Sequence, residues 1–344
     1  KEKNLFTDNK DGEKIGLYAG YDENDEARFV ANKASALIAS GVKPNEIAVL
    51  YRANFQSRAI EEAMISLAVP YQVLGVRFFE RKEVKDVLSF LRLALNPESV
   101  SDLARIINVP PRGIGKVTLA KVVVGKENEL PAAARAKIGA FRKLMEHIRE
   151  EIQKLKTSEL IKYIVQKSGL EAALKNGSDD DKERLMNIME LAAFAGKYDT
   201  LPTEEGAQTL LSDAALASDQ DSLDDKTQKK EGVKLMTVHA SKGLEFEYVF
   251  ITGLEQDLFP HVNLGSPESN DERYEEERRL FYVALTRAKE KLFLSYASIR
   301  TVFGSKQMNI PSDFLNDIDS AHLELADAEE NAPPSTPLKT IYFD

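Results

Sequence analysis

The sequence has 344 residues, of which 43% are hydrophobic and 30% charged, the balance of a globular protein with room for two domains. It has no cysteine and only four histidines, none at zinc-ligand spacing, so we expect neither disulfides nor a metal site. No apolar run reaches membrane-spanning length and no signal peptide opens the chain, so we expect a cytoplasmic protein without a membrane partner.

The net charge of −10 argues against general binding of nucleic acid, because phosphate contacts need Lys and Arg. One stretch is an exception. Residues 103–126 contain no acidic side chain but five basic ones, namely Arg105, Arg112, Lys116, Lys121 and Lys126. A local patch of this kind is able to bind DNA on an otherwise acidic protein.

Strands and helices are predicted to alternate in the first part of the chain. We expect strands over residues 15–20, 47–51 and 71–74, and helices over residues 25–40, 58–67 and 83–95. The run IAVLY at residues 47–51 is apolar throughout, as in a strand buried on both faces of a sheet. Such alternation indicates a parallel α/β sheet.

Between residues 96 and 230 the pattern predicts helices alone. They are expected over residues 102–107, 117–124, 131–156, 158–168, 181–195 and 205–217, followed by a polar linker at 218–230. Strands then return over residues 233–239, 248–254 and 291–297, with a helix over residues 271–289.

This order predicts one α/β domain interrupted by a helical insertion. Residues 1–95 and 231–317 would form the sheet domain, and residues 96–230 the all-helical insertion. Residues 318–344 turn acidic and then proline-rich, so we expect a flexible tail.

Two segments combine apolar strands or helices with charged groups at their ends. Residues 234–261 read KLMTVHASKGLEFEYVFITGLEQDLFPH, and residues 275–297 read EEERRLFYVALTRAKEKLFLSYA. Together they resemble motifs V and VI of the superfamily 1A DNA helicases, the UvrD, PcrA and Rep group, and the resemblance covers about residues 12–317. It implies the C-terminal half of such a helicase, with subdomain 2A as a RecA-like sheet domain, related to the P-loop NTPases, and subdomain 2B as the helical insertion.

One part of a nucleotide site is absent from the sequence. No G-x-x-x-x-G-K-S/T phosphate loop occurs in the 344 residues, so we expect no ATP hydrolysis by this chain alone. The resemblance implies ATP with Mg²⁺ as the cofactor. The phosphate loop, the Mg²⁺ ligands and the catalytic glutamate would come from an N-terminal RecA-like domain.

The resemblance implies nucleotide contacts for four residues. IAVLYRANFQSR resembles motif IV, whose arginine, here Arg52, contacts the γ-phosphate, and Arg287 in VALTRAKEK is the counterpart in motif VI. Two arginines on one phosphate would form a clamp that senses its presence. Glu245 in SKGLEF would accept a hydrogen bond from the ribose, and Gly243 permits the turn beside it.

Residue type alone favours plainer interpretations of some charged positions. Without the resemblance, Arg52 is best explained as an arginine in a salt bridge at the end of a strand. The EEE run at residues 275–277, with Arg278 and Arg279, is interpreted as a solvated helix face. The FFER block at residues 78–81 is assigned to packing and domain coupling.

Contacts with single-stranded DNA are implied for three residues. His239, after the KLMTV strand, matches a residue that contacts the DNA backbone, and His261 and Phe303 match residues that line base-binding pockets. Stacking of bases on aromatic rings tolerates any sequence, which suits a translocating enzyme. From residue type alone, His239 also fits a structural role after a buried strand, and Phe303 fits core packing.

A short turn within the basic stretch has the form of a helix-hairpin-helix motif. Arg112, Gly113, Ile114, Gly115 and Lys116 follow NVPP, and the glycines would let backbone amides approach a phosphate. The pattern alone also fits any tight turn between helices. The resemblance implies that such turns in subdomain 2B contact the duplex ahead of the fork.

As a whole, the resemblance implies the motor half of an ATP-dependent DNA helicase that translocates 3′ to 5′. Its partners would be single-stranded DNA, junctions between single-stranded and double-stranded DNA, and the N-terminal RecA-like domain. Two other classes stay open, a DNA-binding adaptor without an ATPase partner and a helicase–nuclease subunit. The tail is too short for a nuclease fold and the arginine pair has no use in a pure binder, so the adaptor is the better alternative.

Overall fold

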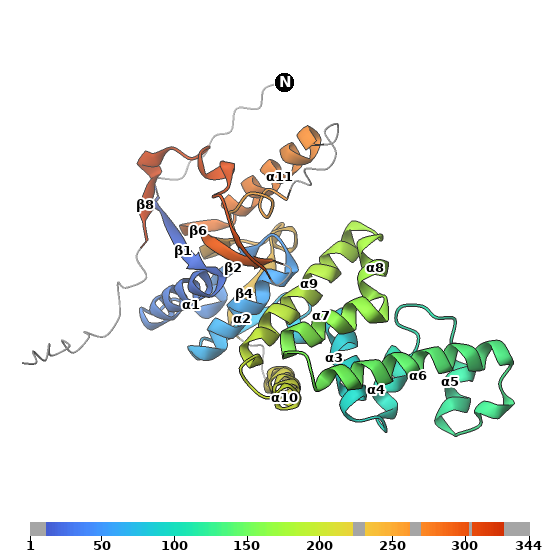
Figure 1. The fold of residues 1–344 in the computed structure, drawn as a ribbon. Coiled ribbons are helices and arrows are strands. Elements are labelled where there is room, and N and C mark those ends of the chain that lie inside the picture. The colour runs from blue at the N-terminus through green and yellow to red at the C-terminus, as the bar shows by residue number, and fades with distance from the viewer. Residues whose placement is uncertain (1–11, 223–230, 262–269, 303–304, 327–344) are drawn as a thin grey trace, which may run out of the picture.

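The sheet domain is built on parallel strands. The computed structural model describes residues 12–222, 231–261, 270–302 and 305–326 (Figure 1). Within these residues the sheet has eight strands. Seven of them pair in parallel, in the order β3-β4-β2-β5-β6-β1-β8, and the eighth, β7, pairs antiparallel with β6. The strands are β1 Ile15–Asp22, β2 Ile47–Tyr51, β3 Tyr71–Val73, β4 Val233–Thr237, β5 Phe246–Thr252, β6 Ala288–Val302, β7 Ser305–Met308 and β8 Leu323–Leu325.

Helices cover both faces of this sheet because its central strands are apolar on both sides. Every residue of β2 is buried, as the uninterrupted run IAVLY predicts. Val49 packs in one cluster with Phe29 of α1 (Glu23–Ala39), whereas Leu50 packs in another with Phe281 of α11 (Asn270–Leu285). Neighbouring residues of a strand point to opposite faces, so one short strand anchors two layers of helix.

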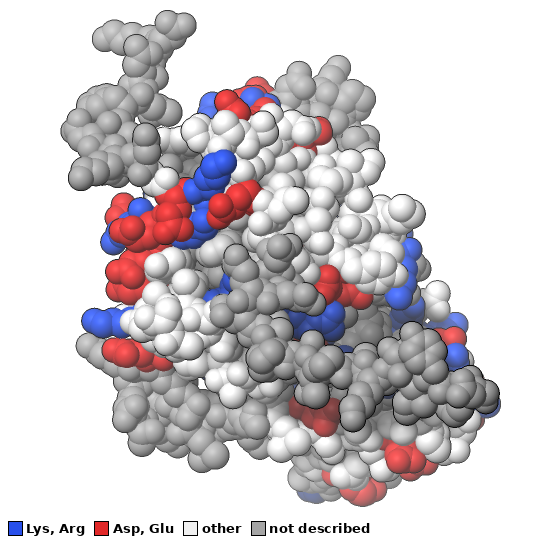
Figure 2. All heavy atoms as spheres, turned by 90° about the vertical axis from the view of Figure 1, so that its left-hand side faces the viewer, with Lys and Arg blue, Asp and Glu red and all other residues white. Residues whose placement is uncertain are grey.

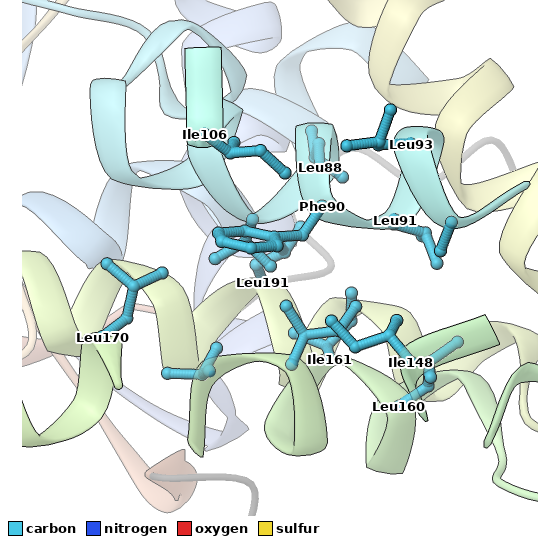
Figure 3. Close-up of a cluster of buried hydrophobic side chains, with 14 of the residues drawn as sticks. Leu88, Phe90, Leu91, Leu93, Ile106, Ile148, Leu160, Ile161, Leu170 and Leu191 are labelled. Atoms are coloured by element: carbon cyan, nitrogen blue, oxygen red, sulfur yellow. The ribbon is translucent and has the colours of Figure 1, made fainter. Parts of the chain in front are cut away.

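The helical part has its own core, to one side of the sheet in Figure 1. Leu88 and Phe90 come from one helix, and Ile148, Ile161 and Leu191 come from three others that pack around them (Figure 3). The helices are α3 Lys82–Leu95, α4 Val100–Ile106, α5 Lys116–Val123, α6 Ala132–Ile152, α7 Thr157–Ser168, α8 Leu170–Lys175, α9 Asp179–Ala195 and α10 Thr203–Ser222. On the sheet domain, α2 Ser57–Ser66 completes the helices of the described residues.

The core of the helical part includes side chains that precede the predicted start of the insertion at residue 96. The buried side chains of α3, and Phe78 before it, belong to the core of the helical part. The sequence pattern alone assigned α3 to the sheet domain, because this is the first α-helix after β3. We propose that the insertion begins near Lys82.

The helix α9 joins the two parts. Arg58 of α2 forms a buried ion pair with Glu190, and Arg81 donates to the side-chain oxygen of Asn187 at 2.8 Å. The predicted coupling role of the FFER block at residues 78–81 is consistent with this contact of Arg81. The helical part is thus fixed to the sheet domain through polar side chains that are themselves buried.

The predicted fold class, a RecA-like parallel sheet interrupted by a helical insertion, is confirmed, but three local predictions differ from the structure. The helix predicted over residues 271–289 ends at Leu285, because the chain from Ala288 pairs with β5. Residues 323–325 of the predicted tail form β8, which pairs with β1; residues 327–344 lie outside the described part. The predicted linker at 218–230 begins as the end of α10, which continues to Ser222.

None of the helices in the described part of the chain is long and apolar enough to cross a membrane. On the face of the molecule in Figure 2, acidic and basic side chains are interspersed.

Candidate functional site

Three parallel strands end together at the carboxyl edge of the sheet. Tyr51, the last residue of β2, lies opposite both Thr237 of β4 and Thr252 of β5. Arg52 directly follows β2, and His239 follows β4 after one intervening residue. In open α/β sheets ligands bind at this edge, so the structure brings these two predicted residues together where a ligand is expected.

Two other predicted residues lie at the opposite, amino edge. Glu245 immediately precedes β5 and Arg287 immediately precedes β6, and the amide of Phe246 donates to the carbonyl of Arg287 at 2.9 Å. The seven residues of β5 separate this edge from the carboxyl edge, a span of roughly 23 Å at about 3.3 Å per residue. The two arginines therefore cannot meet at one phosphate, and the predicted clamp of Arg52 with Arg287 is wrong.

Arg52 is held by a carboxylate that the sequence did not single out. Its Nε donates to both carboxylate oxygens of Glu277, at 3.0 and 2.9 Å, and its Nη2 donates to Oε1 at 2.7 Å. Only 14% of the Arg52 side chain and 8% of the Glu277 side chain are exposed. This forked pairing of guanidinium and carboxylate fixes the direction of both groups. The plain interpretation of Arg52, a salt bridge at a strand end, describes this contact.

Glu277 corrects the interpretation of the EEE run as a solvated face. Its side chain is buried on the inner face of α11, because it lies on the stripe formed by Tyr274, Phe281 and Ala284. The spacing of three and four residues between these positions was visible in the sequence. A carboxylate on the apolar stripe of a helix was the signal that could have identified it.

The two histidines complete the carboxyl edge. The amide of His261 donates to Oε2 of Glu277 at 3.0 Å, so one carboxylate holds both Arg52 and the chain at His261. Partial burial and the positive charge of Arg52 lower the pKa of His239 below its usual value. His239 is the more exposed of the two and His261 is half-buried, which leaves both able to contact a ligand.

A groove of about 1400 Å³ runs along this edge, between the sheet domain and helices α7, α8 and α9. Arg52, His239 and His261 all line it. The helical wall contributes both charged and apolar side chains, among them Lys182 and Tyr163. The lining holds seven Asp or Glu and five Lys or Arg side chains, so contacts with phosphates would be confined to individual cations such as Arg52, while Tyr163 offers an aromatic face for a base.

At the amino edge, Arg287 occupies a turn rather than the predicted helix. Its Nε donates to the carbonyl of Val283 at 2.9 Å and its Nη1 to the carbonyl of Leu244 at 2.7 Å. The second bond fixes the guanidinium beside Glu245, the next residue after Leu244. Arg287 therefore lies against the turn that carries the other predicted nucleotide residues.

The residues of this turn are open to a ligand. Gly243 has φ +86°, a conformation that glycine adopts without strain, and the space where its side chain would lie is empty. Glu245 is exposed, with its Oε2 3.8 Å from Nζ of Lys289. An exposed carboxylate and a positioned guanidinium fit one side of a nucleotide. Among the described residues, no group of three or more His, Asp or Glu side chains could hold a metal ion.

The hairpin in the helical part has a tight turn at Gly113, where φ is +67°. The side-chain oxygen of Asn108 accepts from the amides of Arg112, at 2.7 Å, and Ile114, at 3.2 Å. Ile114 is buried and anchors the turn to the core of the helical part. Gly115 caps α5 without a side-chain hydrogen bond, so the first amides of this helix are open to an anion.

The structure differs from the prediction for the side chain of Arg112. Its Nη1 donates to the carbonyl of Val109 at 2.6 Å, its Nη2 to that of Ser168 at 3.0 Å, and its guanidinium lies over the rings of Phe90 and Phe141. These contacts hold the hairpin onto the helical core. The side chain of Arg112 is therefore structural, because its donors point into the protein.

The basic stretch is partly neutralised in space. Arg105 lies 2.7 Å from Asp86, and Lys121 and Lys126 lie 3.3 and 3.7 Å from Glu129. Lys116 is exposed and has no ion pair with any residue that the structure describes. The acid-free run therefore leaves a small cationic site at the hairpin rather than a broad patch. Phe303, the last predicted DNA residue, lies outside the described residues.

The buried position of Glu277 leads to a prediction about stability. In the variant Glu277→Ala, Arg52 keeps its charge but loses its only carboxylate partner among the described residues, so unfolding should cost about 3 kcal/mol less than in the parent protein. Glu275→Ala on the same helix removes a surface pair with Arg278 and should change stability by less than about 0.5 kcal/mol. Urea denaturation of both variants checks this, and equal midpoints would contradict the structural role of Glu277.

Comparisons with known proteins identify the family of the chain. The sequence model of the UvrD-like helicase C-terminal domain matches residues 1–299. The ATP-dependent DNA helicase PcrA of Bacillus subtilis (strain 168) is 37% identical over 345 residues, covering 94% of this chain and 46% of that protein. PcrA of Staphylococcus epidermidis (strain ATCC 12228) is 38% identical over 337 residues, covering 92% of this chain and 46% of that protein.

PcrA of Staphylococcus aureus (strain NCTC 8325) is 37% identical over 343 residues. The chain thus spans about half the length of the curated relatives it matches. The family model covers most of the chain, including both the sheet domain and the helical insertion. The chain belongs to the family of UvrD-like helicase C-terminal domains.

Proposed function

We propose that this chain is the second motor half of an ATP-dependent DNA helicase that moves 3′ to 5′ along single-stranded DNA. The observation that carries the proposal is the position of β5, which has Glu245 at its amino end and the segment 253–261 at its carboxyl end. The nucleotide would be contacted at the amino edge and the DNA at the carboxyl edge. One buried strand would then move with both ligands.

On the DNA side, Arg52 is reassigned from the γ-phosphate to the DNA track. Its Nε and Nη2 are held by Glu277, whereas its Nη1 has no hydrogen-bond partner among the described residues. A guanidinium that is fixed on two sides and lines the groove would be able to bind a backbone phosphate. His239 and His261 line the same groove and would contact the backbone and a base.

On the nucleotide side, Arg287 and Glu245 would hold ATP from one face. Bound ATP with Mg²⁺ would supply the phosphoryl group that is transferred to water. The guanidinium of Arg287 would stabilise the negative charge on that group, and the carboxylate of Glu245 would accept a hydrogen bond from the ribose. The phosphate loop and the Mg²⁺ ligands would come from an N-terminal RecA-like half, because the 344 residues contain no phosphate loop.

The motor proposal predicts complementation between two separate halves. Single-strand-stimulated ATP hydrolysis should be absent for this chain alone and should appear when it is mixed with a phosphate-loop half of one of the PcrA relatives. Arg287→Ala should lower the turnover of the mixture by about a hundredfold or more, with DNA binding retained. Arg278→Ala is the matched control, because Arg278 is an exposed arginine of α11 that pairs with Glu275 and Asp317, and this change should leave turnover unchanged.

Each contrary result has a definite meaning. Hydrolysis by the chain alone would contradict the division into halves. Unchanged turnover in Arg287→Ala would remove this arginine from the nucleotide site. Intact DNA binding without hydrolysis in any mixture would favour the DNA-binding adaptor.

We also propose that the hairpin at residues 112–116 contacts the duplex through its backbone amides and Lys116. Gly113→Val places a branched side chain where φ is +67° and should weaken binding to a tailed duplex severalfold more than binding to single-stranded DNA. Gly125→Val is the matched control, since Gly125 has φ +70° and lies at the other end of α5. Equal losses on both DNA substrates, measured by fluorescence anisotropy, would refute a role for the hairpin in duplex binding.

A further inference from the structure

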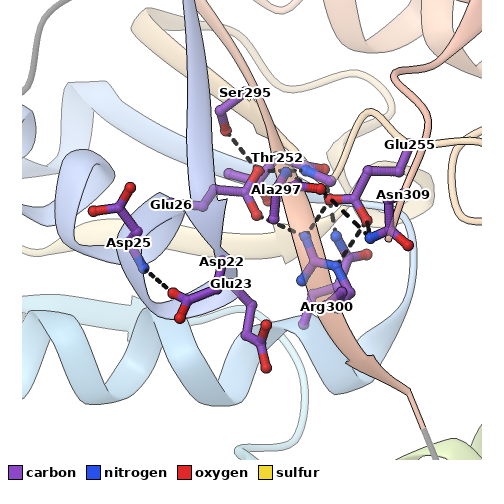
Figure 4. Close-up of polar contacts among 12 residues, drawn as sticks. Asp22, Glu23, Asp25, Glu26, Thr252, Glu255, Ser295, Ala297, Arg300 and Asn309 are labelled. Carbon is purple, nitrogen blue, oxygen red and sulfur yellow. Dashed lines mark hydrogen bonds and ion pairs between the residues drawn. The ribbon is translucent and has the colours of Figure 1, made fainter. Parts of the chain in front are cut away.

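A buried ion cluster beside the carboxyl edge has no part in the function proposed above. Arg300 of β6 donates from Nη2 to Glu26 of α1 at 2.8 Å and from Nε to Glu255 at 2.9 Å (Figure 4). The three residues are 5%, 4% and 1% exposed. One guanidinium thus bridges two carboxylates that come from different elements.

The remaining lone pairs of the two carboxylates fasten the backbone nearby. Glu26 accepts from the amide of Gly253 and from the hydroxyl of Ser295, both at 2.8 Å. Glu255 accepts from the amide of Ala297 at 2.8 Å and from the side chain of Asn309. The cluster therefore connects α1, the turn after β5, β6 and the segment after β7, as Figure 4 shows.

Stability alone is a poor explanation for three charges in this place. Removing a charge from water carries a large free-energy cost, and apolar side chains of similar volume often stabilise a core at least as well. Burial raises the pKa of Glu26, and the charge of Arg300 opposes that rise. The charged groups fix the orientation of the segments that they join, because each hydrogen bond constrains an angle as well as a distance.

The turn that these ions fix leads to the DNA edge. The carbonyl of Glu255 accepts from the amides of Leu258 and Phe259, at 3.1 and 2.8 Å, and Phe259 is fully buried. The chain then reaches His261, whose amide is held by Glu277. The segment from Glu255 to His261 is thus anchored at both ends by a buried carboxylate, each paired with an arginine.

The same cluster holds the base of the hairpin formed by β6 and β7. Arg300 pairs with Gln307 across this hairpin, and Asn309 follows its second strand. The side chains of Arg300 and Asn309 both reach Glu255. A rigid attachment of the hairpin to the turn after β5 is the consequence.

We propose that Arg300, Glu255 and Glu26 are positioning residues for the DNA track: they hold the turn at residues 255–261 and the base of the β6–β7 hairpin in the geometry that binds single-stranded DNA. This inference rests on the proposed function, since it takes the carboxyl edge to be the DNA edge. None of the three residues lines the groove, so they act through the segments that they hold.

The test is a neutral triple variant, Glu26→Gln with Glu255→Gln and Arg300→Met. It removes all three charges but keeps side-chain oxygens that accept from the amides of Gly253 and Ala297. Affinity for a fluorescein-labelled oligothymidylate is measured at several salt concentrations, together with the melting temperature. We expect a folded protein with a melting temperature close to that of the parent and an affinity about tenfold weaker.

The dependence on salt separates positioning from direct contact. Arg52→Ala should make the plot of log affinity against log salt concentration shallower, by about one in the magnitude of its slope, because a phosphate contact is lost. The triple variant should keep the parental slope, since its residues touch no phosphate. A reduced slope in the triple variant would overturn the positioning role.

Two further variants keep the test decisive. Lys291→Met removes another buried cation of β6, paired with Glu324 near the other end of the strand, and should leave DNA affinity unchanged. Arg300→Lys keeps the charge but not the forked geometry, so it should fold and still bind DNA more weakly, and it decides the question if the triple variant does not fold. Parental affinity in a folded triple variant or in Arg300→Lys would overturn this inference alone. Unchanged affinity in Arg52→Ala, or no binding by the parent protein, would overturn the DNA side of the proposed function and this inference with it.

Discussion

The parallel register of β2, β4, β5 and β6 is the constraint on which the arrangement of both sites depends. Because these strands run in one direction, a residue that follows a strand and a residue that precedes one lie at opposite edges of the sheet. Arg52 belongs to the first kind and Arg287 to the second. The proposed nucleotide and DNA sites are therefore joined by a single buried strand, β5, so that a shift of the sheet domain at one site is carried as a rigid-body movement to the other.

Buried carboxylates shape the carboxyl edge, where we propose that DNA binds. Glu277 holds Arg52 and the amide of His261, and Glu255 holds Arg300 and the amide of Ala297. Glu277 comes from α11 and Glu255 from the turn after β5, so neither belongs to a strand of the sheet. Charged groups fixed in this way need little rearrangement when a phosphate binds, as the proposed repeated binding and release of a DNA strand would require.

The alternation of apolar runs with amphipathic helices predicted the fold, because burial on both faces of a strand leaves a clear mark in the sequence, as in IAVLY. Placing the site residues in space needed more. The motifs identified Arg52 and Arg287 but not the edge of the sheet at which each residue lies. That position follows only from the direction of the strands. Glu277 belongs to an acidic run, residues 275–277, whose members differ only in the side of α11 on which they lie. The inward turn of Arg112 and the neutralisation of Lys121 by Glu129 depend on contacts between segments that periodicity does not locate.

The most direct test of the two-edge account is hydrogen exchange, measured by mass spectrometry, on this chain with and without an oligothymidylate. The account predicts that DNA slows exchange in peptides that contain residues 52–56, 239–241 and 255–261, along the carboxyl edge. Peptides that contain residues 243–245 and 286–288, at the amino edge, should exchange as they do in the free protein. Protection at the amino edge with no change at the carboxyl edge would contradict the account, because the DNA would then occupy the side assigned to the nucleotide.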